Sequence, residues 1–208
     1  DVMDGSLSAH KNIIYELSYT NNSLQLIEEW TVEFDYAHGI HFDEISGNVY
    51  TVSKTNDYIA KINPNEVQIP FSNPLLVSMD STINYNHTIT VNRLRPIAIT
   101  SKYPYMFITC SAGEWSANEE YEEIPGQVQM WHIDDMNLLA TAQFDVYSRP
   151  WHIEVSPIED KIFIALLGGY EDSDSGVACL EFSYLNNEYT LSEVWKNTSS
   201  EYGTMHGI

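Results

Sequence analysis

Three segments of the chain open in the same way at a nearly constant spacing. They are AHGIHFDEISGNVYTVS (37–53), RPIAITSKYPYMFITCS (95–111) and RPWHIEVSPIEDKIFIAL (149–166). Each has a short apolar run, a turn on Asp, Ser, Pro or Gly, and a second β-rich run. When Ile40, Ile99 and Ile153 are aligned, Ile208 falls in the same column, and the steps are 59, 54 and 55 residues. A repeat of this length constrains the fold more than any single motif does.

Further β-rich segments fill the intervals between these openings, and they alternate apolar and polar residues as half-buried strands do. Third strands are predicted at 57–64, 126–134 and 176–184, and fourth strands at 87–94, 138–146 and 189–197. Residues 11–20 and 24–32, joined by an Asn-rich turn, read as the last two strands of an earlier unit. Helical periodicity with caps is absent from the sequence, so the chain is predicted to be all-β.

Four antiparallel strands in a unit of about 55 residues are typical of a β-propeller blade. A β-sandwich would explain short strands but not a recurring four-strand unit with a repeated opening. The predicted blades are 36–93, 94–147 and 148–197, with partial blades at 9–33 and 204–208. Closed propellers have about four to eight blades. We therefore expect residues 1–208 to be a single segment of a six- to eight-bladed propeller, because a four-bladed ring would lack one strand.

The openings resemble those of NHL and YVTN (YncE-like) propeller repeats, whose usual form is close to R-P-H-G-I-x-x-[DS]-P-x-G-x-[IVL]-Y-[VI]. Residues 37–52 and 149–165 match this form, and residues 95–109 match it less well. The resemblance covers nearly the whole chain and implies a propeller fold. It says little about function, because such repeats serve enzymes, scaffolds and binding proteins alike. Together with the acidity of the chain, it implies an extracellular, cell-surface or periplasmic location.

The charge balance restricts the partners of the chain. Its formal net charge is −21, from 30 acidic and 9 basic residues. Nucleic acids and anionic membranes require a basic face, so neither is an expected partner. The sequence also contains no apolar run of the roughly 18 residues that a membrane span needs. An acidic surface of this kind suits solubility, cation binding or a basic partner.

The two cysteines, Cys110 and Cys179, carry little information about function. No C-x-x-C motif occurs, which excludes a zinc ribbon and a thioredoxin-like site. One disulfide and two free buried thiols are both compatible with the sequence.

The propeller topology predicts one face on which the candidate ligand-binding residues gather. Loops that lead into first strands and loops between second and third strands emerge on the same face, around the channel mouth. The candidates are Arg95, Arg149, Trp115, Glu119, Glu120, Glu122 and Glu123. The arginines could bind an anionic ligand or tie neighbouring blades to carboxylates. The acidic loop 111–126 could meet a cation or a basic partner or be only solvated, and its Trp115 could be a platform for a glycan or peptide or an anchor for the loop.

Two sets of residues are candidate metal ligands. The histidines of the first strands are His38, His41, His152 and His206, and imidazoles from several inner strands can converge on one zinc or copper ion. Alternatively, each imidazole bonds the backbone of a neighbouring blade. In the loop 168–176, Asp172 and Asp174 form a D-x-D-x-G pattern that suits calcium, although it lacks the spacing of an EF-hand.

The sequence favours a non-catalytic module that binds a ligand or a protein partner through one loop face. The alternative is a metalloenzyme with zinc or copper held by channel histidines, and a third possibility is a structural domain within a larger chain or assembly. No nucleophile elbow, P-loop or H-E-x-x-H motif is present. Enzymatic activity is therefore left open.

Overall fold

Nearly all of the described chain is β-structure. The structure, a computed structural model, describes residues 12–32, 37–54, 57–65, 75–78, 94–112, 125–146, 148–168, 175–202 and 207. These residues form fourteen strands and one short 3₁₀ turn, Ser200–Tyr202. None of the helical structure described is long and apolar enough to cross a membrane. The prediction of an all-β fold is confirmed.

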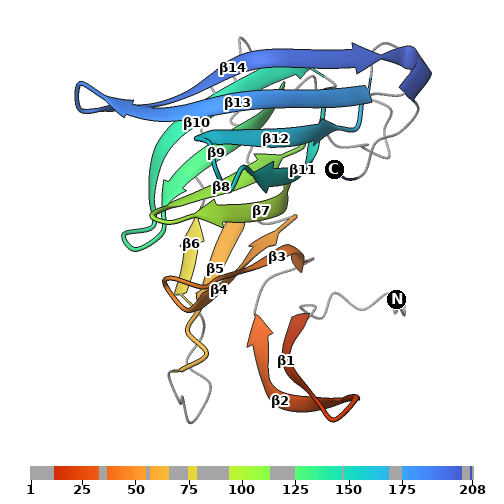
Figure 1. The fold of residues 1–208 in the computed structure, drawn as a ribbon, viewed down its shortest axis with the longest axis vertical. Coiled ribbons are helices and arrows are strands. Elements are labelled where there is room, and N and C mark those ends of the chain that lie inside the picture. The colour runs from red at the N-terminus through yellow and green to blue at the C-terminus, as the bar shows by residue number, and fades with distance from the viewer. Residues whose placement is uncertain are drawn as a thin grey trace.

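Twelve strands form three antiparallel sheets of four strands each, and every sheet follows the chain order of its strands. The first sheet contains β3 (Ala37–Asp43), β4 (Asn48–Ser53), β5 (Tyr58–Ile62) and β6 (Leu75–Ser78). The second contains β7 (Pro96–Lys102), β8 (Tyr105–Cys110), β9 (Pro125–His132) and β10 (Asn137–Val146). The third contains β11 (Pro150–Val155), β12 (Lys161–Leu166), β13 (Ser175–Leu185) and β14 (Glu188–Ser199). The sheets succeed one another along the long axis of the molecule (Figure 1).

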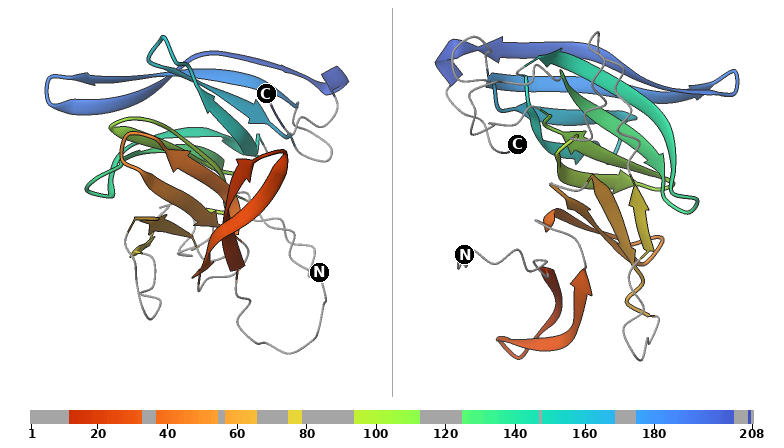
Figure 2. Two further views of the ribbon diagram at one scale, coloured as in Figure 1. Left: turned by 60° about the horizontal axis from the view of Figure 1, so that its bottom comes forward. Right: turned by 180° about the vertical axis from the view of Figure 1, so that it is seen from behind.

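The remaining two strands, β1 (Asn12–Thr20) and β2 (Ser23–Val32), pair only with each other. The hairpin lies at the end of the molecule that carries the first sheet (Figure 2). Its turn residues Asn21 and Asn22 have φ angles of 52° and 61°, and the turn Asn186–Asn187 between β13 and β14 has 53° and 67°. Asparagine tolerates this left-handed region, which explains why the same Asn-rich turn recurs.

The prediction for the fourth strand of the first sheet was wrong. That strand is β6, which pairs with β5 from Leu75 opposite Lys61 to Ser78 opposite Tyr58. We expected it at 87–94, of which residues 87–93 lie outside the described part of the chain. The four-residue strand was missed because so short an apolar run has no measurable period-two pattern.

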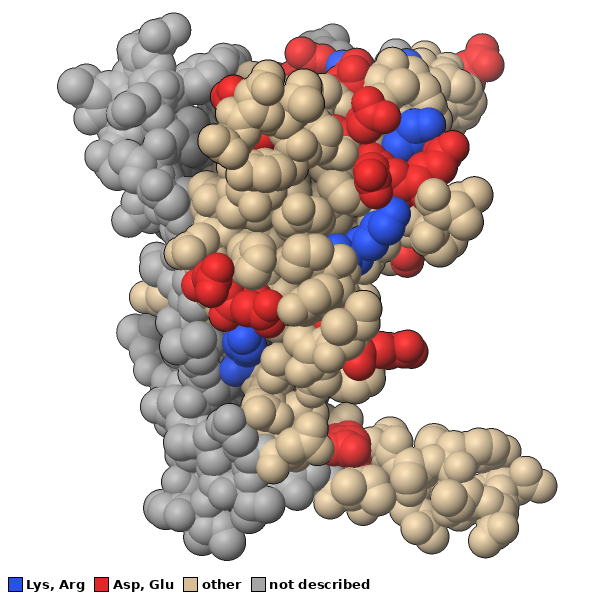
Figure 3. All heavy atoms as spheres, turned by 60° about the vertical axis from the view of Figure 1, so that its left-hand side comes forward, with Lys and Arg blue, Asp and Glu red and all other residues tan. Residues whose placement is uncertain are grey.

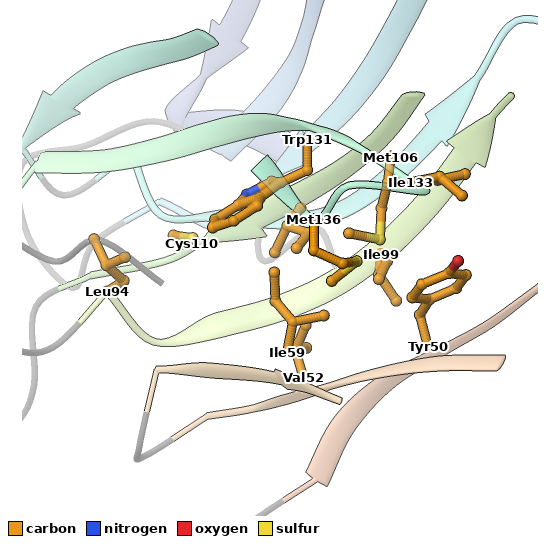
Figure 4. Packing of buried hydrophobic residues seen from close by; sticks show 11 residues of the cluster. Tyr50, Val52, Ile59, Leu94, Ile99, Met106, Cys110, Trp131, Ile133 and Met136 are labelled. Atoms are coloured by element: carbon orange, nitrogen blue, oxygen red, sulfur yellow. The ribbon is translucent and has the colours of Figure 1, made fainter. Parts of the chain in front are cut away.

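Apolar side chains fill the space between consecutive sheets. Tyr50 and Val52 of β4 and Ile59 of β5 point toward Met106 and Trp131 of the second sheet (Figure 4). A second cluster lies between the second and third sheets and includes Phe107, Met130, Ile162, Ile164 and Phe182. Burial of these side chains supplies the main driving force for stacking the sheets.

The two outward-facing sheet surfaces also carry large apolar side chains. Ile40 and Phe42 of β3 are exposed, and so are Val194 and Trp195 of β14. In β3, the alternate residues Gly39 and His41 face β7, so Ile40 and Phe42 face the other way. The first and last sheets therefore both carry exposed apolar side chains, although Ala60 and Ile62 on the outward face of the first sheet are buried.

Replacing Phe107 by alanine tests the packing between the second and third sheets. Phe107 is fully buried, and its ring centroid lies 4.8 Å from that of Phe182. We expect Phe107→Ala to lower the free energy of unfolding by about 3–5 kcal/mol, measured by urea denaturation. Phe42→Ala removes the same atoms from an exposed position and should cost about 0.5 kcal/mol or less. Equal losses in the two variants would contradict the assignment of the core.

Candidate functional site

The three first strands share an irregularity at the same point. The register of β3 with β4 shifts between Ala37 and Ile40, that of β7 with β8 between Pro96 and Ala98, and that of β11 with β12 between Pro150 and His152. These shifts surround His38, Ile97 and Trp151, which the repeat alignment places in one column. A bulge re-aims the side chain at its position and is common beside functional sites.

The three aligned residues meet. His38 Nδ1 lies 2.8 Å from the carbonyl oxygen of Ile97, and the His38 ring contacts the Trp151 ring edge-on at a centroid distance of 5.7 Å. The Thr109 hydroxyl donates to the carbonyl oxygen of Trp151 at 3.2 Å. Because these residues come from all three sheets, they mark the place where the sheets converge. We call this place the channel mouth.

Gly39 allows the first two sheets to approach each other there. A Cβ atom at this position would lie 2.8 Å from the Ile97 carbonyl oxygen and 3.0 Å from the Cα atom of Ala98. Such contacts would force the strands apart and remove the hydrogen bond from His38. The His-Gly pair of the repeat is therefore explained by close packing of neighbouring first strands.

Arg95 and Arg149 occupy equivalent turns at the entry to β7 and β11. Their φ angles are 51° and 49°, in the left-handed region. The carbonyl oxygen of Arg95 accepts a hydrogen bond from the Ser111 N–H, and that of Arg149 accepts one from the Leu167 N–H, both at 3.0 Å. The two candidate arginines are thus held in the same way in successive sheets.

Two further backbone hydrogen bonds, next to those of the arginine carbonyls, fix where two long loops begin. The Ala112 N–H donates to the Leu94 carbonyl at 3.0 Å, and the Gly168 N–H donates to the Ser148 carbonyl at 3.2 Å. Both loops therefore leave the sheets beside the entry turns. The loop residues 113–124 and 169–174 lie outside the described part of the chain, and with them Trp115, Glu119, Glu120, Glu122, Glu123, Asp172 and Asp174.

Basic side chains gather around Trp151. Lys54 Nζ lies 5.6 Å from the centroid of the indole, and Arg149 Cζ lies 5.9 Å from it, both within cation–π range. Burial lowers the pKa of His38, the hydrogen bond to Ile97 opposes this, and the charges of Lys54 and Arg95 lower it further. The described basic side chains Lys54, Arg95 and Arg149 thus lie around His38 and Trp151, and the Asp57 carboxylate lies beside them at the Arg95 N–H.

The cluster contains three of the nine basic residues of the chain, Lys54, Arg95 and Arg149. Three lysines elsewhere form ion pairs with single carboxylates: Lys102 with Asp160 at 3.0 Å, Lys161 with Glu159 at 2.9 Å and Lys196 with Asp145 at 2.6 Å. On the side of the molecule shown in Figure 3, basic side chains likewise lie next to acidic ones.

A second group, His41, Ser101 and Asp43, joins β3 to β7. The Ser101 hydroxyl donates to Asp43 Oδ2 at 2.5 Å, and His41 Nε2 lies 2.7 Å from Ser101 Oγ. The hydroxyl has a single proton, which forms the hydrogen bond to Asp43. His41 must therefore donate a hydrogen bond to Ser101 Oγ through its Nε2–H. An imidazole that activates a serine nucleophile would accept that proton instead. The arrangement is a link between sheets rather than a catalytic triad.

The Asp43 carboxylate is well satisfied in this link. Its Oδ1 accepts a hydrogen bond from the Ser46 N–H at 2.7 Å. Burial raises the pKa of Asp43, but the hydrogen bonds from Ser101 and Ser46 outweigh that effect and hold the pKa below its ordinary value. Burial lowers the pKa of His41, and Asp43 and Glu154 only partly compensate. At neutral pH the link therefore consists of a carboxylate, a hydroxyl and a neutral imidazole.

Asp57 forms a third connection between the first and second sheets. This buried residue precedes β5, and its carboxylate accepts hydrogen bonds from the Leu94 N–H at 3.0 Å and the Arg95 N–H at 3.1 Å. Asp57 thereby caps the entry turn of the second sheet. No motif in the sequence marks this residue. The only signal was an Asn-Asp pair in a turn, a composition that tolerates the observed φ of 53°.

Among the described histidines of the first strands, His38 alone bonds the backbone of a neighbouring sheet, as the structural alternative expected. His41 contacts the Ser101 side chain of the second sheet, and His152 Nε2 lies 3.4 Å from Glu154 Oε1 of its own strand. Within the described ranges, no three His, Cys, Asp or Glu residues form a group that could hold a metal ion. His206 lies outside these ranges, so the metal site of the sequence analysis stays a prediction. Cys110 and Cys179 are both free and buried.

Comparison with known proteins supports the fold. No protein-family model matches the chain, and no curated protein sequence matches it. Among solved structures, the chain is similar to the C-terminal WD40 domain of Sif2 (TM-score 0.57, 11% identity, 88% of this chain and 42% of that chain). It is also similar to a chain of the mitotic checkpoint complex (TM-score 0.54, 11% identity, 94% of this chain and 51% of that chain). A third similar structure is a chain of the nidogen/laminin complex (TM-score 0.52, 11% identity, 95% of this chain and 65% of that chain). These likenesses confirm the predicted β-propeller fold.

The chain spans between 42% and 65% of the length of these three structures. It therefore corresponds to only part of the propellers that it resembles.

The lowered pKa values of His38 and His41 predict how the free energy of unfolding depends on pH. Both His38 and His41 have a pKa below the ordinary value of 6.5 in the folded chain, so the unfolded chain binds more protons as the pH falls. We expect the free energy of unfolding to be constant above about pH 7 and to decrease as the pH falls below about 6.5. The measurement is urea denaturation at several pH values. The variant His38→Gln, His41→Gln should lose much of this decrease, and an unchanged decrease would contradict the assignment.

Asp57 gives a second test of the contacts between sheets. Asp57→Asn replaces one acceptor oxygen by an NH₂ group, which leaves the N–H group of Leu94 or Arg95 without a partner. We expect a loss of about 1–3 kcal/mol in the free energy of unfolding. The same change at Asp145, which is exposed and bonded to Lys196, should cost about 0.5 kcal/mol or less. Similar losses in both variants would show that the Asp57 cap is not important for stability.

Proposed function

We propose that the chain is part of a β-propeller that binds a protein partner, without catalysis, through the face around the channel mouth. One observation carries this proposal: three successive sheets bring His38, Lys54, Arg149 and Trp151 together at one rim. Two long loops also start beside that rim. Two of the similar propellers were solved within protein complexes, the mitotic checkpoint complex and the nidogen/laminin complex. Convergent side chains and loops on a rigid scaffold are the usual basis of such binding.

The proposal includes several finer features that rest on the sequence. Residues 1–208 form one segment of a six- to eight-bladed propeller with NHL- or YVTN-like repeats. The acidic loop 111–126, with Trp115 and its glutamates, attracts a basic or polar region of the partner. The net charge of −21 and the resemblance support an extracellular, cell-surface or periplasmic location.

A charge-matched pair of variants tests the binding face. The immobilised chain is incubated with protein extract from its source cells, and bound proteins are cross-linked and identified by mass spectrometry. Lys54→Gln, Arg149→Gln removes two positive charges at the mouth, and Lys161→Gln, Lys196→Gln removes two elsewhere. We expect the mouth variant to recover about tenfold less of a partner that the wild type and the control both recover.

The result is interpreted only if both variants have the thermal stability of the wild type. Binding should also weaken as salt is raised, because the attraction is electrostatic. Equal recovery by the mouth variant and the control would contradict binding at this face.

A further inference from the structure

We propose that two copies of the chain associate head to tail, with the β1–β2 hairpin of one copy packed on the outer face of the third sheet of the other. The inference concerns surfaces other than the channel mouth and goes beyond the proposed function. It follows from the equivalence of two hairpins and from the repeat of the sheets.

The β1–β2 and β13–β14 hairpins are built in the same way. Both turn on an Asn-Asn pair at positive φ, and the residue pairs that follow have the same register as far as Leu17 opposite Leu26 and Phe182 opposite Leu191. The tyrosine before each turn also makes the same hydrogen bond. The Tyr19 hydroxyl donates to Asn22 Oδ1 at 3.2 Å, and the Tyr184 hydroxyl donates to Asn187 Oδ1 at 3.1 Å.

Equivalent side chains of the two hairpins differ in burial. Phe182 is 4% exposed, and its ring centroid lies 4.8 Å from that of Phe107 in the second sheet. Tyr189 and Leu191 pack against the same cluster. Their counterparts in the first hairpin are exposed by more than half: Leu17 by 53%, Leu24 by 67% and Leu26 by 57%. The face that β13–β14 packs against the preceding sheet is therefore open in β1–β2.

The first hairpin needs a cover of this kind. Among the described strands β1 and β2 pair only with each other, and an isolated two-stranded hairpin is at best marginally stable in water. Opposite residues and alternate residues of a strand share a face, so the three leucines and Tyr19, which is 68% exposed, form one apolar stripe. Burial of this stripe against a sheet supplies the stabilisation that the pair of strands lacks.

The outer face of the third sheet offers the matching surface. Tyr50, Phe107 and Phe163 occupy one column of the repeat, because each precedes the residue that pairs with the aligned isoleucine. Tyr50 and Phe107 are buried against the following sheet. Phe163 alternates with Ile162, which faces the second sheet, so the Phe163 ring points outward. There its centroid lies 6.3 Å from that of Trp195, which is 44% exposed.

The two open faces therefore complement each other. Phe107 receives Phe182 in the contact between the second and third sheets, and Phe163 receives Leu17 when the same contact forms between copies. One copy cannot make this contact with itself, because its hairpin and its third sheet lie at opposite ends (Figure 1). The chain spans 42% to 65% of the length of the similar propellers, so two copies correspond to roughly one propeller. Two head-to-tail contacts then close a ring.

Sedimentation equilibrium of the chain over a range of concentrations tests the association. We expect a reversible dimer whose dissociation constant falls as salt is raised, because the contact is apolar and the charge of −21 on each copy opposes it. Partner binding at the channel mouth should weaken with salt, so the two effects are distinguishable. A monomer at every concentration overturns the inference.

A charge-matched pair of variants locates the contact on the hairpin. Leu17→Glu, Leu26→Glu places two negative charges on the apolar stripe. Ser18→Glu, Gln25→Glu places two on the opposite face, at the neighbouring residue pair. We expect the first variant to raise the dissociation constant at least about tenfold and the second to change it about twofold or less. Equal effects of the two variants overturn the inference.

A mixture of variants tests whether the contact is head to tail. Trp195→Gln removes the indole from the third sheet but keeps the hairpin, whereas Leu17→Glu, Leu26→Glu keeps the third sheet. Each variant alone should dissociate, and their mixture should regain one contact, seen as a higher sedimentation coefficient of a fluorescently labelled variant. A dimer that survives Trp195→Gln, or a mixture of folded variants that stays monomeric, overturns the inference. If circular dichroism shows that Trp195→Gln does not fold, the hairpin pair decides, because its leucines are exposed.

Discussion

The structure depends on the close approach of the first strands of neighbouring sheets. Gly39 leaves room for the backbone of β7, and His38 then reaches the Ile97 carbonyl. That approach lets Tyr50, Val52 and Ile59 of the first sheet pack against the second. It also brings the bulges of β3, β7 and β11 to one point, so one packing constraint produces both the stacked sheets and the channel mouth.

The polar contacts between the first two sheets follow the same line of contact. Asp57 lies at the mouth end of the interface, His38 next to it, and the His41–Ser101–Asp43 link further along β3 and β7. The apolar cluster of Tyr50, Val52 and Ile59 fills the space behind them. Each buried polar group has a specific partner on the other sheet, so these contacts define the relative position of the sheets more than they add to the driving force for packing.

Much of the fold could be predicted from the sequence, and less of the site. The repeated openings gave the first strands and the column that unites His38, Ile97 and Trp151, because strand periodicity and repeat spacing are properties of the sequence itself. β6 was missed because four residues are too few for a pattern. Arg149 was predicted at the mouth, but its contact with Trp151 and that of Lys54 were not. Their meeting depends on how bulges turn side chains between sheets, and no spacing along the chain encodes that geometry.

Asp57 has a consequence for how the protein is made. Its carboxylate belongs to the first sheet, but it accepts hydrogen bonds from the N–H groups of Leu94 and Arg95, which lead into the second sheet. During synthesis residue 57 leaves the ribosome before residues 94 and 95. The acceptor is therefore outside the exit tunnel before the turn that it caps. The first sheet thus carries the group that fixes where the second sheet starts.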